Sequence, residues 1–215
     1  MKTIDKIYIN GSFVTPKGTQ MFDLINPTRN QLTGQVQLGN EEDAEIAIAA
    51  AKKAFKTFSK TTKAERIDYL NRLHQAVSKR KEELINAVVE EYGGTLQFAK
   101  MSMEFSLSAF TSAISTLEKY DFTKKMGNSD VVLDPIGVVG IIIPWNSSNG
   151  FVCGKLATAI AAGCTVVIKP SEMSARQTQL ITECIHEAGL PEGIFNIVNG
   201  CLLYTSDAAD EEDSV

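Results

Sequence analysis

The chain has 215 residues, 44% hydrophobic and 22% charged, which is the composition of an ordinary globular protein of one large or two small domains. No apolar run approaches the ~18 residues needed to cross a bilayer, and residues 1–10 lack a secretory signal, so we predict a cytoplasmic protein without a membrane partner. The net charge of -5 resides in residues 201–215, because the 26 acids include five there and the others balance the 21 lysines and arginines; no basic field favours nucleic acid.

Four cysteines, at Cys153, Cys164, Cys184 and Cys201, show no CxxC or Cys/His spacing typical of zinc. In a chain without an export signal we expect reduced thiols, buried as small apolar side chains apart from Cys201 in the acidic tail. We therefore predict no metal site.

Residues 6–14 contain Asn10-Gly11 between apolar residues, a dipeptide that suits the positive φ values of a tight hairpin turn. Residues 21–25 and 32–38 continue this β region. The chain should therefore open with small β elements.

Three helices are predicted next. Asn40 is a favoured N-cap for the first helix, and Thr62 with Glu65 forms a capping box for the second, which continues with a bend to Tyr92. The third covers residues 96–120 and is followed by a polar connector over 121–130. Its expected apolar stripe consists of Phe98, Met101, Phe105, Ala109, Ser112 and Thr116. We expect the three helices to form a layer on one side of the following sheet.

A strand, helix, strand, helix, strand pattern occupies the rest of the chain. Runs rich in β-branched residues at 138–143 and 165–169 flank a segment of helical length, and a helix at 177–188 precedes a third strand at 194–198. The first run is apolar without alternation, which predicts a strand covered on both faces, as in a parallel sheet. The pattern indicates an α/β fold.

Ligands bind such sheets at the carboxyl ends of the strands. The residues there are Pro144, Trp145 and Asn146 after the first strand and Lys169, Pro170, Ser171 and Glu172 after the second. From the residues alone, Asn146 is also a good helix cap, Trp145 is equally a core aromatic, and Lys169 with Glu172 is also a solvated ion pair. Residue type leaves these alternatives open.

Three motifs carry a resemblance to a known family: PWN at 144–146, KLATAIAAGCTVVIKPSE at 155–172 and EAGLPEGIFNIVNG at 187–200. In this order and at these separations they resemble the cofactor-binding half of the aldehyde dehydrogenase superfamily, over residues 1–200. The resemblance implies an incomplete Rossmann-like parallel sheet with an N-terminal helical layer. It also implies NAD-dependent oxidation of a small aldehyde to a carboxylic acid and, for the full-length enzyme, a homo-oligomer.

The resemblance also assigns roles to residues. Asn146 would donate its amide to the oxyanion formed when an enzyme cysteine attacks the aldehyde. Lys169, Ser171 and Glu172 would hold the adenosine ribose, and the Glu172 carboxylate would repel a 2′-phosphate, which favours NAD over NADP. Ile142, Ile143, Pro144, Trp145 and Asn146 would line the cofactor pocket.

We divide the chain into residues 1–130, the N-terminal β-hairpin and helical layer; 131–200, a partial NAD-binding βαβαβ unit; and 201–215. The last segment departs from the family pattern in mid-motif, and we expect a disordered, non-native tail, the alternative being a natural acidic interaction tail. The family's nucleophilic cysteine and general-base glutamate would lie beyond the end of this chain. We therefore predict a fragment that is inactive alone.

Two other functions remain open at this stage. Acyl-phosphate- and acyl-CoA-linked reductases share the fold and the thioester chemistry. In a different class, the chain would be a non-catalytic nucleotide-binding or interaction module. Measurable NAD binding discriminates a surviving cofactor site from an incomplete domain.

Overall fold

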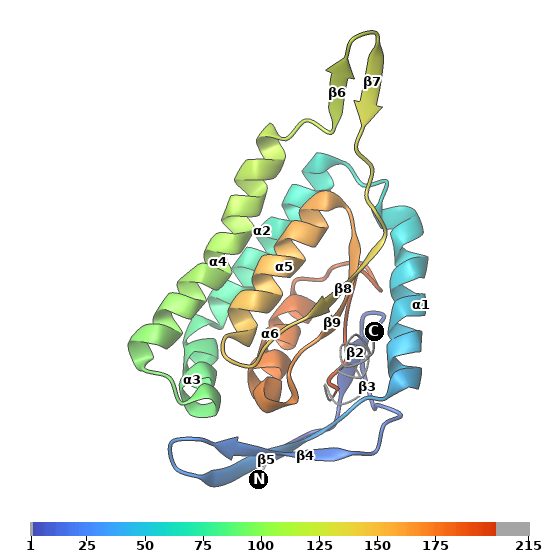
Figure 1. The fold of residues 1–215 in the computed structure, drawn as a ribbon. Coiled ribbons are helices and arrows are strands. Elements are labelled where there is room, and N and C mark those ends of the chain that lie inside the picture. Colours follow the sequence, from blue (N-terminus) through green and yellow to red (C-terminus); the bar gives the residue numbers. More distant parts are fainter. Residues whose placement is uncertain (1, 201–215) are drawn as a thin grey trace, which may run out of the picture.

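The computed structural model describes residues 2–200, so the predictions made for residues 201–215 lie outside the described residues. A small sheet with strand order β1-β5-β4 lies at one end of the molecule (Figure 1). Its strands are β1 (Lys2–Ile4), β4 (Met21–Asn26) and β5 (Gln31–Gln37). β4 and β5 pair antiparallel, which confirms the two β segments predicted there, and β1 adds to β5 in parallel.

The predicted N-terminal hairpin is confirmed by strands β2 (Ile7–Ile9) and β3 (Ser12–Val14), which pair antiparallel. Asn10 and Gly11 form its turn with φ values of 50° and 82°, which these residues tolerate best. β2 also pairs antiparallel with a strand near residue 197. The hairpin thus extends the sheet formed by residues beyond 130, and our division at residue 130 remains a prediction.

The central sheet has the strand order β3-β2-β10-β9-β8. Its C-terminal strands are β8 (Val138–Ile142), β9 (Thr165–Lys169) and β10 (Phe195–Ile197). β8 pairs with β9, and β9 with β10, in parallel. The connecting elements are α5 (Ser148–Ala162), the short 3-10 helix η1 (Glu172–Ser174) and α6 (Ala175–Glu187). The predicted βαβαβ pattern is therefore confirmed.

Helices cover both faces of this sheet (Figure 1). The N-terminal helices are α1 (Glu41–Phe58), α2 (Lys63–Lys79), α3 (Lys81–Tyr92) and α4 (Leu96–Lys119). α1 packs on β8, β9 and β10 from one side, whereas α5 lies on the other side, with α2 and α4 packed against α5. The expectation that all early helices share one side was wrong for α1.

Local signals place the helix ends. Asn40 caps α1 and the Thr62–Glu65 capping box starts α2, as predicted, and Asp43 completes a second capping box with Asn40. The long second helix breaks at Arg80, whose φ of -107° and ψ of 20° separate α2 from α3. α3 then ends at Gly93 in the left-handed conformation, with a φ of 73°.

The predicted apolar stripe of α4 is only partly buried. Phe98 and Ala109 pack against the core, but the prediction was wrong for Met101 and Phe105. Met101 and Phe105 are 63% and 59% exposed. The buried face instead carries Ala99, Ser102, Met103, Ser106, Phe110 and Leu117. Small side chains such as Ser102 and Ser106 let α4 approach α5 closely, and that fit outweighs the apolarity of the other stripe.

A second hairpin projects from the top of the molecule in Figure 1 and is formed by β6 (Thr123–Met126) and β7 (Ser129–Val132). It lies within the segment predicted as a polar connector, apart from its last two residues. All eight of its residues are exposed, including the apolar Met126 and Val132. An isolated two-stranded hairpin has little stability of its own.

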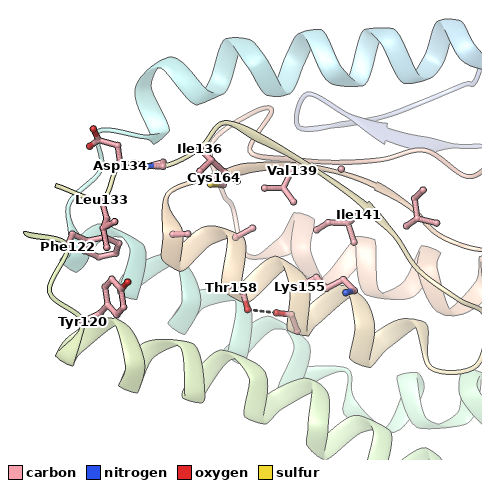
Figure 2. Close-up of a pocket in the computed structure, with 16 residues that line it drawn as sticks. Tyr120, Phe122, Leu133, Asp134, Ile136, Val139, Ile141, Lys155, Thr158 and Cys164 are labelled. Atoms are coloured by element: carbon pink, nitrogen blue, oxygen red, sulfur yellow. Dashed lines mark hydrogen bonds between the residues drawn. The ribbon is translucent and has the colours of Figure 1, made fainter. Parts of the chain in front are cut away.

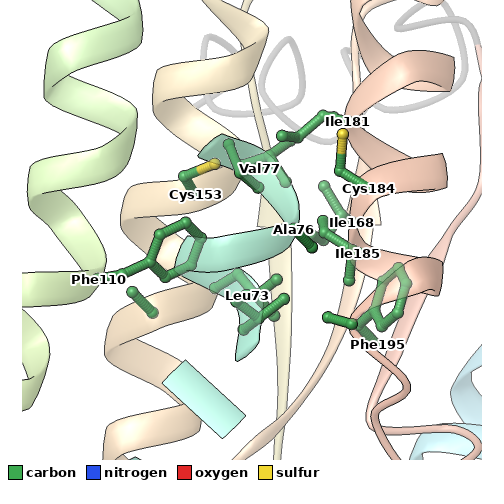
Figure 3. Close-up of a cluster of buried hydrophobic side chains, with 14 of the residues drawn as sticks. Leu73, Ala76, Val77, Phe110, Cys153, Ile168, Ile181, Cys184, Ile185 and Phe195 are labelled. Atoms are coloured by element: carbon green, nitrogen blue, oxygen red, sulfur yellow. The ribbon is translucent and has the colours of Figure 1, made fainter. Parts of the chain in front are cut away.

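The core joins the sheet to α2, α4, α5 and α6 (Figure 3). Cys153 on α5 and Cys184 on α6 lie in it, and Cys164 is also buried, as predicted. Burial raises the pKa of the Cys153 thiol far above its usual range and that of Cys184 to about 12. Neither is suited to act as a thiolate nucleophile.

Candidate cofactor site

The carboxyl ends of β8, β9 and β10 meet at one edge of the central sheet. Ile142 is the register partner of Lys169, and the Ile143 N–H donates to the Lys169 carbonyl over 3.1 Å. The Lys169 ammonium in turn donates to the Gly200 carbonyl oxygen over 2.8 Å. The segments that follow all three strands are therefore neighbours, which is the place where parallel sheets bind ligands.

Lys169 and Glu172 face each other across this edge. The Lys169 Nζ lies 3.9 Å from Glu172 Oε2, and their side chains are only 17% and 12% exposed. Within residues 2–200, Glu172 Oε2 is a buried acceptor without a hydrogen-bond partner. The pair is thus more enclosed than a solvated ion pair, and its carboxylate has a free lone pair for a hydroxyl donor.

Ser171 is 2% exposed, and its side chain forms a hydrogen bond within the protein. It is the N-cap of η1, where its Oγ accepts from the Met173 N–H over 3.3 Å. This bond shapes the turn that presents Glu172. The structure therefore gives Ser171 a structural role, and its predicted contact with a ribose remains a prediction.

Asn146 lies between the end of β8 and the start of α5 and is partly exposed. The next residue, Ser147, is the N-cap position of α5, and its Oγ lies 2.6 Å from Ser102 Oγ on α4. The helix-cap alternative for Asn146 is therefore not observed. Its amide remains a candidate oxyanion donor.

Trp145 is 45% exposed and is not a core aromatic. Its ring lies 5.4 Å from that of Tyr92, at an interplanar angle of 50°. Both rings border a cavity of about 490 Å³ between the end of α3 and the β4–β5 hairpin, with Met173 beside them. Pro144 is also exposed, so this loop offers surface to a ligand.

The two isoleucines predicted to line the cofactor pocket differ in exposure. Ile143 is 2% exposed and belongs to the core, whereas Ile142 is 58% exposed. The reason is that β8 is the edge strand of the sheet, so the expectation of a strand covered on both faces was wrong for β8. Buried residues such as Val166 and Ile168 show that the expectation suits β9 better.

Ile142 borders a cavity of about 680 Å³ beside β8 and α5 (Figure 2). Its lining includes the apolar residues Phe122, Leu133, Ile136, Val139 and Ile141, together with Lys155 and Thr158. Asn146, Lys169 and Glu172 do not line this cavity. Ile142 thus borders this cavity while its backbone lies beside Lys169 in the sheet, and its place in the cofactor pocket remains a prediction.

Glu91, at the end of α3, binds the start of α6, the helix that follows η1. No sequence signal indicated this contact. The Glu91 carboxylate accepts the backbone N–H groups of Arg176 and Gln177 over 2.7 and 2.9 Å, in the first turn of α6. Burial outweighs these bonds and raises the pKa of Glu91 to about 7. The neighbouring charges are Arg176 and Glu90, which pair with each other.

Because its pKa is raised on folding, the folded protein holds a proton on Glu91 that the unfolded chain releases. The contribution of Glu91 to stability should therefore be most favourable below pH 4.5 and fall as the pH rises from 4.5 to about 7. Glu91→Gln removes this dependence, so the wild type should lose about 2 to 3 kcal/mol relative to the variant across the window. Urea unfolding at pH 5, 6, 7 and 8 measures it.

The matched control is Glu90→Gln, which removes an exposed carboxylate one residue away that pairs with the Arg176 side chain. Its stability relative to the wild type should vary little with pH. A difference between the wild type and Glu91→Gln that stays constant from pH 5 to pH 8 would contradict the assignment.

The described residues contain no group of three or more His, Cys, Asp or Glu side chains able to hold a metal ion. Among the helices of residues 2–200, none has the length and apolarity to span a membrane. What remains is an α/β protein with enclosed polar side chains at the carboxyl ends of parallel strands. The carboxyl ends of the strands are where open α/β sheets bind their ligands.

Comparison with known proteins identifies the family. The family model described as the aldehyde dehydrogenase family matches residues 13–210, so the chain belongs to the aldehyde dehydrogenase family. A 3-succinoylsemialdehyde-pyridine dehydrogenase from a Pseudomonas species is 37% identical over 202 residues, which cover 93% of this chain and 42% of that relative. The chain therefore spans less than half the length of this relative.

Two solved structures have the same fold. The aldehyde dehydrogenase of Bartonella henselae superposes with a TM-score of 0.91 at 32% identity, covering 96% of this chain and 45% of that chain. A cysteine-to-alanine mutant of aldehyde dehydrogenase C from Pseudomonas syringae, complexed with NAD+ and octanal, gives a TM-score of 0.89 at 36% identity; the match covers 92% of this chain and 41% of that one. These matches confirm the predicted α/β fold and the recognised family.

Proposed function

We propose that this chain supplies the cofactor-binding part and the oxyanion donor of an enzyme that oxidises an aldehyde to a carboxylic acid with NAD. The observation that carries the proposal is the buried Glu172 Oε2 at the carboxyl end of β9, which forms an ion pair with Lys169 but has no hydrogen-bond donor within residues 2–200. A solved relative, aldehyde dehydrogenase C, holds NAD+ and octanal. We take the cofactor class and the substrate class of this enzyme from that relative.

The residues present suit the adenosine ribose of NAD. Glu172 accepts from a ribose hydroxyl, and Lys169 donates from the opposite side of the pair. A 2′-phosphate would meet the Glu172 carboxylate, so NAD should bind more tightly than NADP. When bound, the nicotinamide supplies the hydride acceptor of the oxidation.

Asn146 would act on the substrate. An amide N–H₂ held beside the sheet edge can donate a hydrogen bond to an oxyanion that develops on the aldehyde oxygen. Within residues 2–200, the described thiols are buried and those of Cys153 and Cys184 have raised pKa values. We therefore propose that none of these three thiols is the nucleophile and that residues 2–200 alone do not turn over aldehyde.

Calorimetry with NAD and NADP tests this proposal. NAD should bind at least about tenfold more tightly than NADP. Glu172→Gln should weaken NAD binding and reduce the ratio of the NAD affinity to the NADP affinity. Glu82→Gln removes an exposed carboxylate at the start of α3 and is the control that should change neither affinity. A chain that binds neither dinucleotide would contradict the proposal and favour an incomplete domain.

Self-association belongs to the same proposal. The exposed β6–β7 hairpin carries Met126 and Val132 at 66% and 58% exposure and has little stability of its own, which supports a homo-oligomer that covers it. Sedimentation across a hundredfold range of concentration tests this, and a monomer throughout would contradict it. The predicted cytoplasmic location stays a prediction.

A further inference from the structure

Two buried serines connect the two halves of the candidate site. The Ser148 hydroxyl, in the first turn of α5, donates to Ser174 Oγ, at the end of η1, over 2.6 Å. Both residues are 0% exposed. Ser148 follows Asn146 by two residues, and Ser174 follows Glu172 by two residues. Each serine therefore belongs to the segment that presents one of the candidate site residues.

Each serine hydroxyl also has a backbone carbonyl partner in its own segment. Ser174 Oγ donates to the Ser171 carbonyl oxygen over 3.1 Å, within the turn that holds Glu172. The Ser148 Oγ also lies 3.4 Å from the Pro144 carbonyl oxygen, in the loop that holds Asn146. A buried hydroxyl is costly unless it is paired, and each serine here pairs both with its own segment and with the opposite one.

Neighbouring contacts fix the ends of this connection. Thr178 Oγ1 donates to the Ser174 carbonyl oxygen over 2.9 Å and anchors η1 to α6. On the other side, Ser147 Oγ lies 2.6 Å from Ser102 Oγ and anchors the Asn146 loop to α4. The Ser148–Ser174 bond therefore joins two segments that are each held to a different helix.

We propose that Ser148 and Ser174 are positioning residues whose hydrogen bond sets the separation between the Asn146 loop and the Glu172 turn, so that one extended dinucleotide contacts both. The inference rests on the proposed function in taking NAD as that ligand. The adenosine ribose engages the Glu172 turn, and the nicotinamide half must reach the Asn146 loop, where the aldehyde reacts. A ligand that occupies only the ribose end does not depend on the separation.

Hydrogen exchange of the protein without ligand tests the connection directly. Ser148→Ala should speed amide exchange in residues 171–176, which lie on the far side of the bond. Ser174→Ala should reciprocally speed exchange in residues 144–149. The double variant should exchange no faster than the faster single variant in either segment, because both substitutions remove the same bond.

The matched control is Ser106→Ala, which removes another fully buried serine hydroxyl, one that donates to the Ser102 carbonyl oxygen within α4. It should leave exchange in both site segments unchanged. Faster exchange confined to the segment that carries the substitution, or additive effects in the double variant, would overturn the inference.

Ligand binding separates positioning from a general loss of structure. Ser148→Ala and Ser174→Ala should each weaken NAD about tenfold and change AMP, which has only the ribose end, by less than about twofold. Equal weakening of NAD and AMP, or of neither, would overturn the positioning role. If the wild type binds no NAD, the proposed function fails, and the exchange experiment alone decides whether the serines connect the two segments.

Discussion

Replacing Gly163 by alanine is expected to lower the free energy of unfolding by about 4 kcal/mol. Gly163 ends α5 with a φ of 79°, in the left-handed region where a side chain costs about 1 kcal/mol. A Cβ there would lie 2.4 Å from Arg66 Nη2 and 2.5 Å from its Cζ. The guanidinium must therefore move, and its contacts make up the rest of the cost.

Arg66 joins three segments of the chain. It is 6% exposed and donates to the carbonyl oxygens of Ser59 and Ala161 and to Thr61 Oγ1. Its positive charge lies at the carboxyl end of α5, where the helix dipole favours a cation. Displacing it leaves partly buried carbonyl groups of the α1–α2 connection and of α5 unpaired, at up to about 1 to 3 kcal/mol each.

Urea unfolding of Gly163→Ala measures the loss, with Gly127→Ala as the matched control. Gly127 also has a left-handed φ, of 62°, but a Cβ added there meets nothing within 4 Å. The control should lose only about 1 kcal/mol. Equal losses in the two variants would show that backbone strain alone matters and that Arg66 does not constrain Gly163.

Asp43→Ala should destabilise the protein by a similar amount, about 4 kcal/mol. The Asp43 carboxylate is 2% exposed and accepts backbone N–H groups from Lys17, Gly18 and Asn40 at 2.9 to 3.1 Å. It thus closes the capping box of α1 and also fixes the loop before β4. Alanine leaves three backbone donors without their acceptor.

A graded pair of variants isolates the carboxylate. Asp43→Asn keeps one acceptor oxygen and should lose about half as much as Asp43→Ala. Asp121→Ala is the control, because Asp121 is exposed and accepts one backbone N–H, from Thr123 over 2.9 Å. It should cost less than about 1 kcal/mol. An Asp43→Ala protein as stable as the control would contradict the assigned role.

Several elements could be predicted from the sequence because their signals are local. Asn10-Gly11 predicts a hairpin because both residues tolerate a positive φ, and Thr62 with Glu65 predicts a helix start through reciprocal bonds three residues apart. The alternation of apolar runs with helical segments between residues 138 and 198 likewise predicts parallel strands. Such signals need no knowledge of distant contacts.

Other predictions failed because they depended on partners remote in the sequence. The stripe with Met101 and Phe105 is as apolar as the buried face of α4, and only packing against α2 and α5 decides which face is buried. The run at 138–143 is apolar throughout, yet its place at the sheet edge leaves Ile142 exposed. Periodicity describes a helix or strand but not its neighbours.

The candidate site likewise has features that the sequence predicts and contacts that only the fold creates. Residue type and motif order by themselves determined the family and drew attention to Asn146, Lys169 and Glu172 at the strand ends. Only the tertiary structure brought Ser148 to Ser174, across 26 positions, and Glu91 to the start of α6, across 85. Backbone preferences act between near neighbours in the chain, whereas burial and hydrogen bonding across helices exist only after the chain has folded.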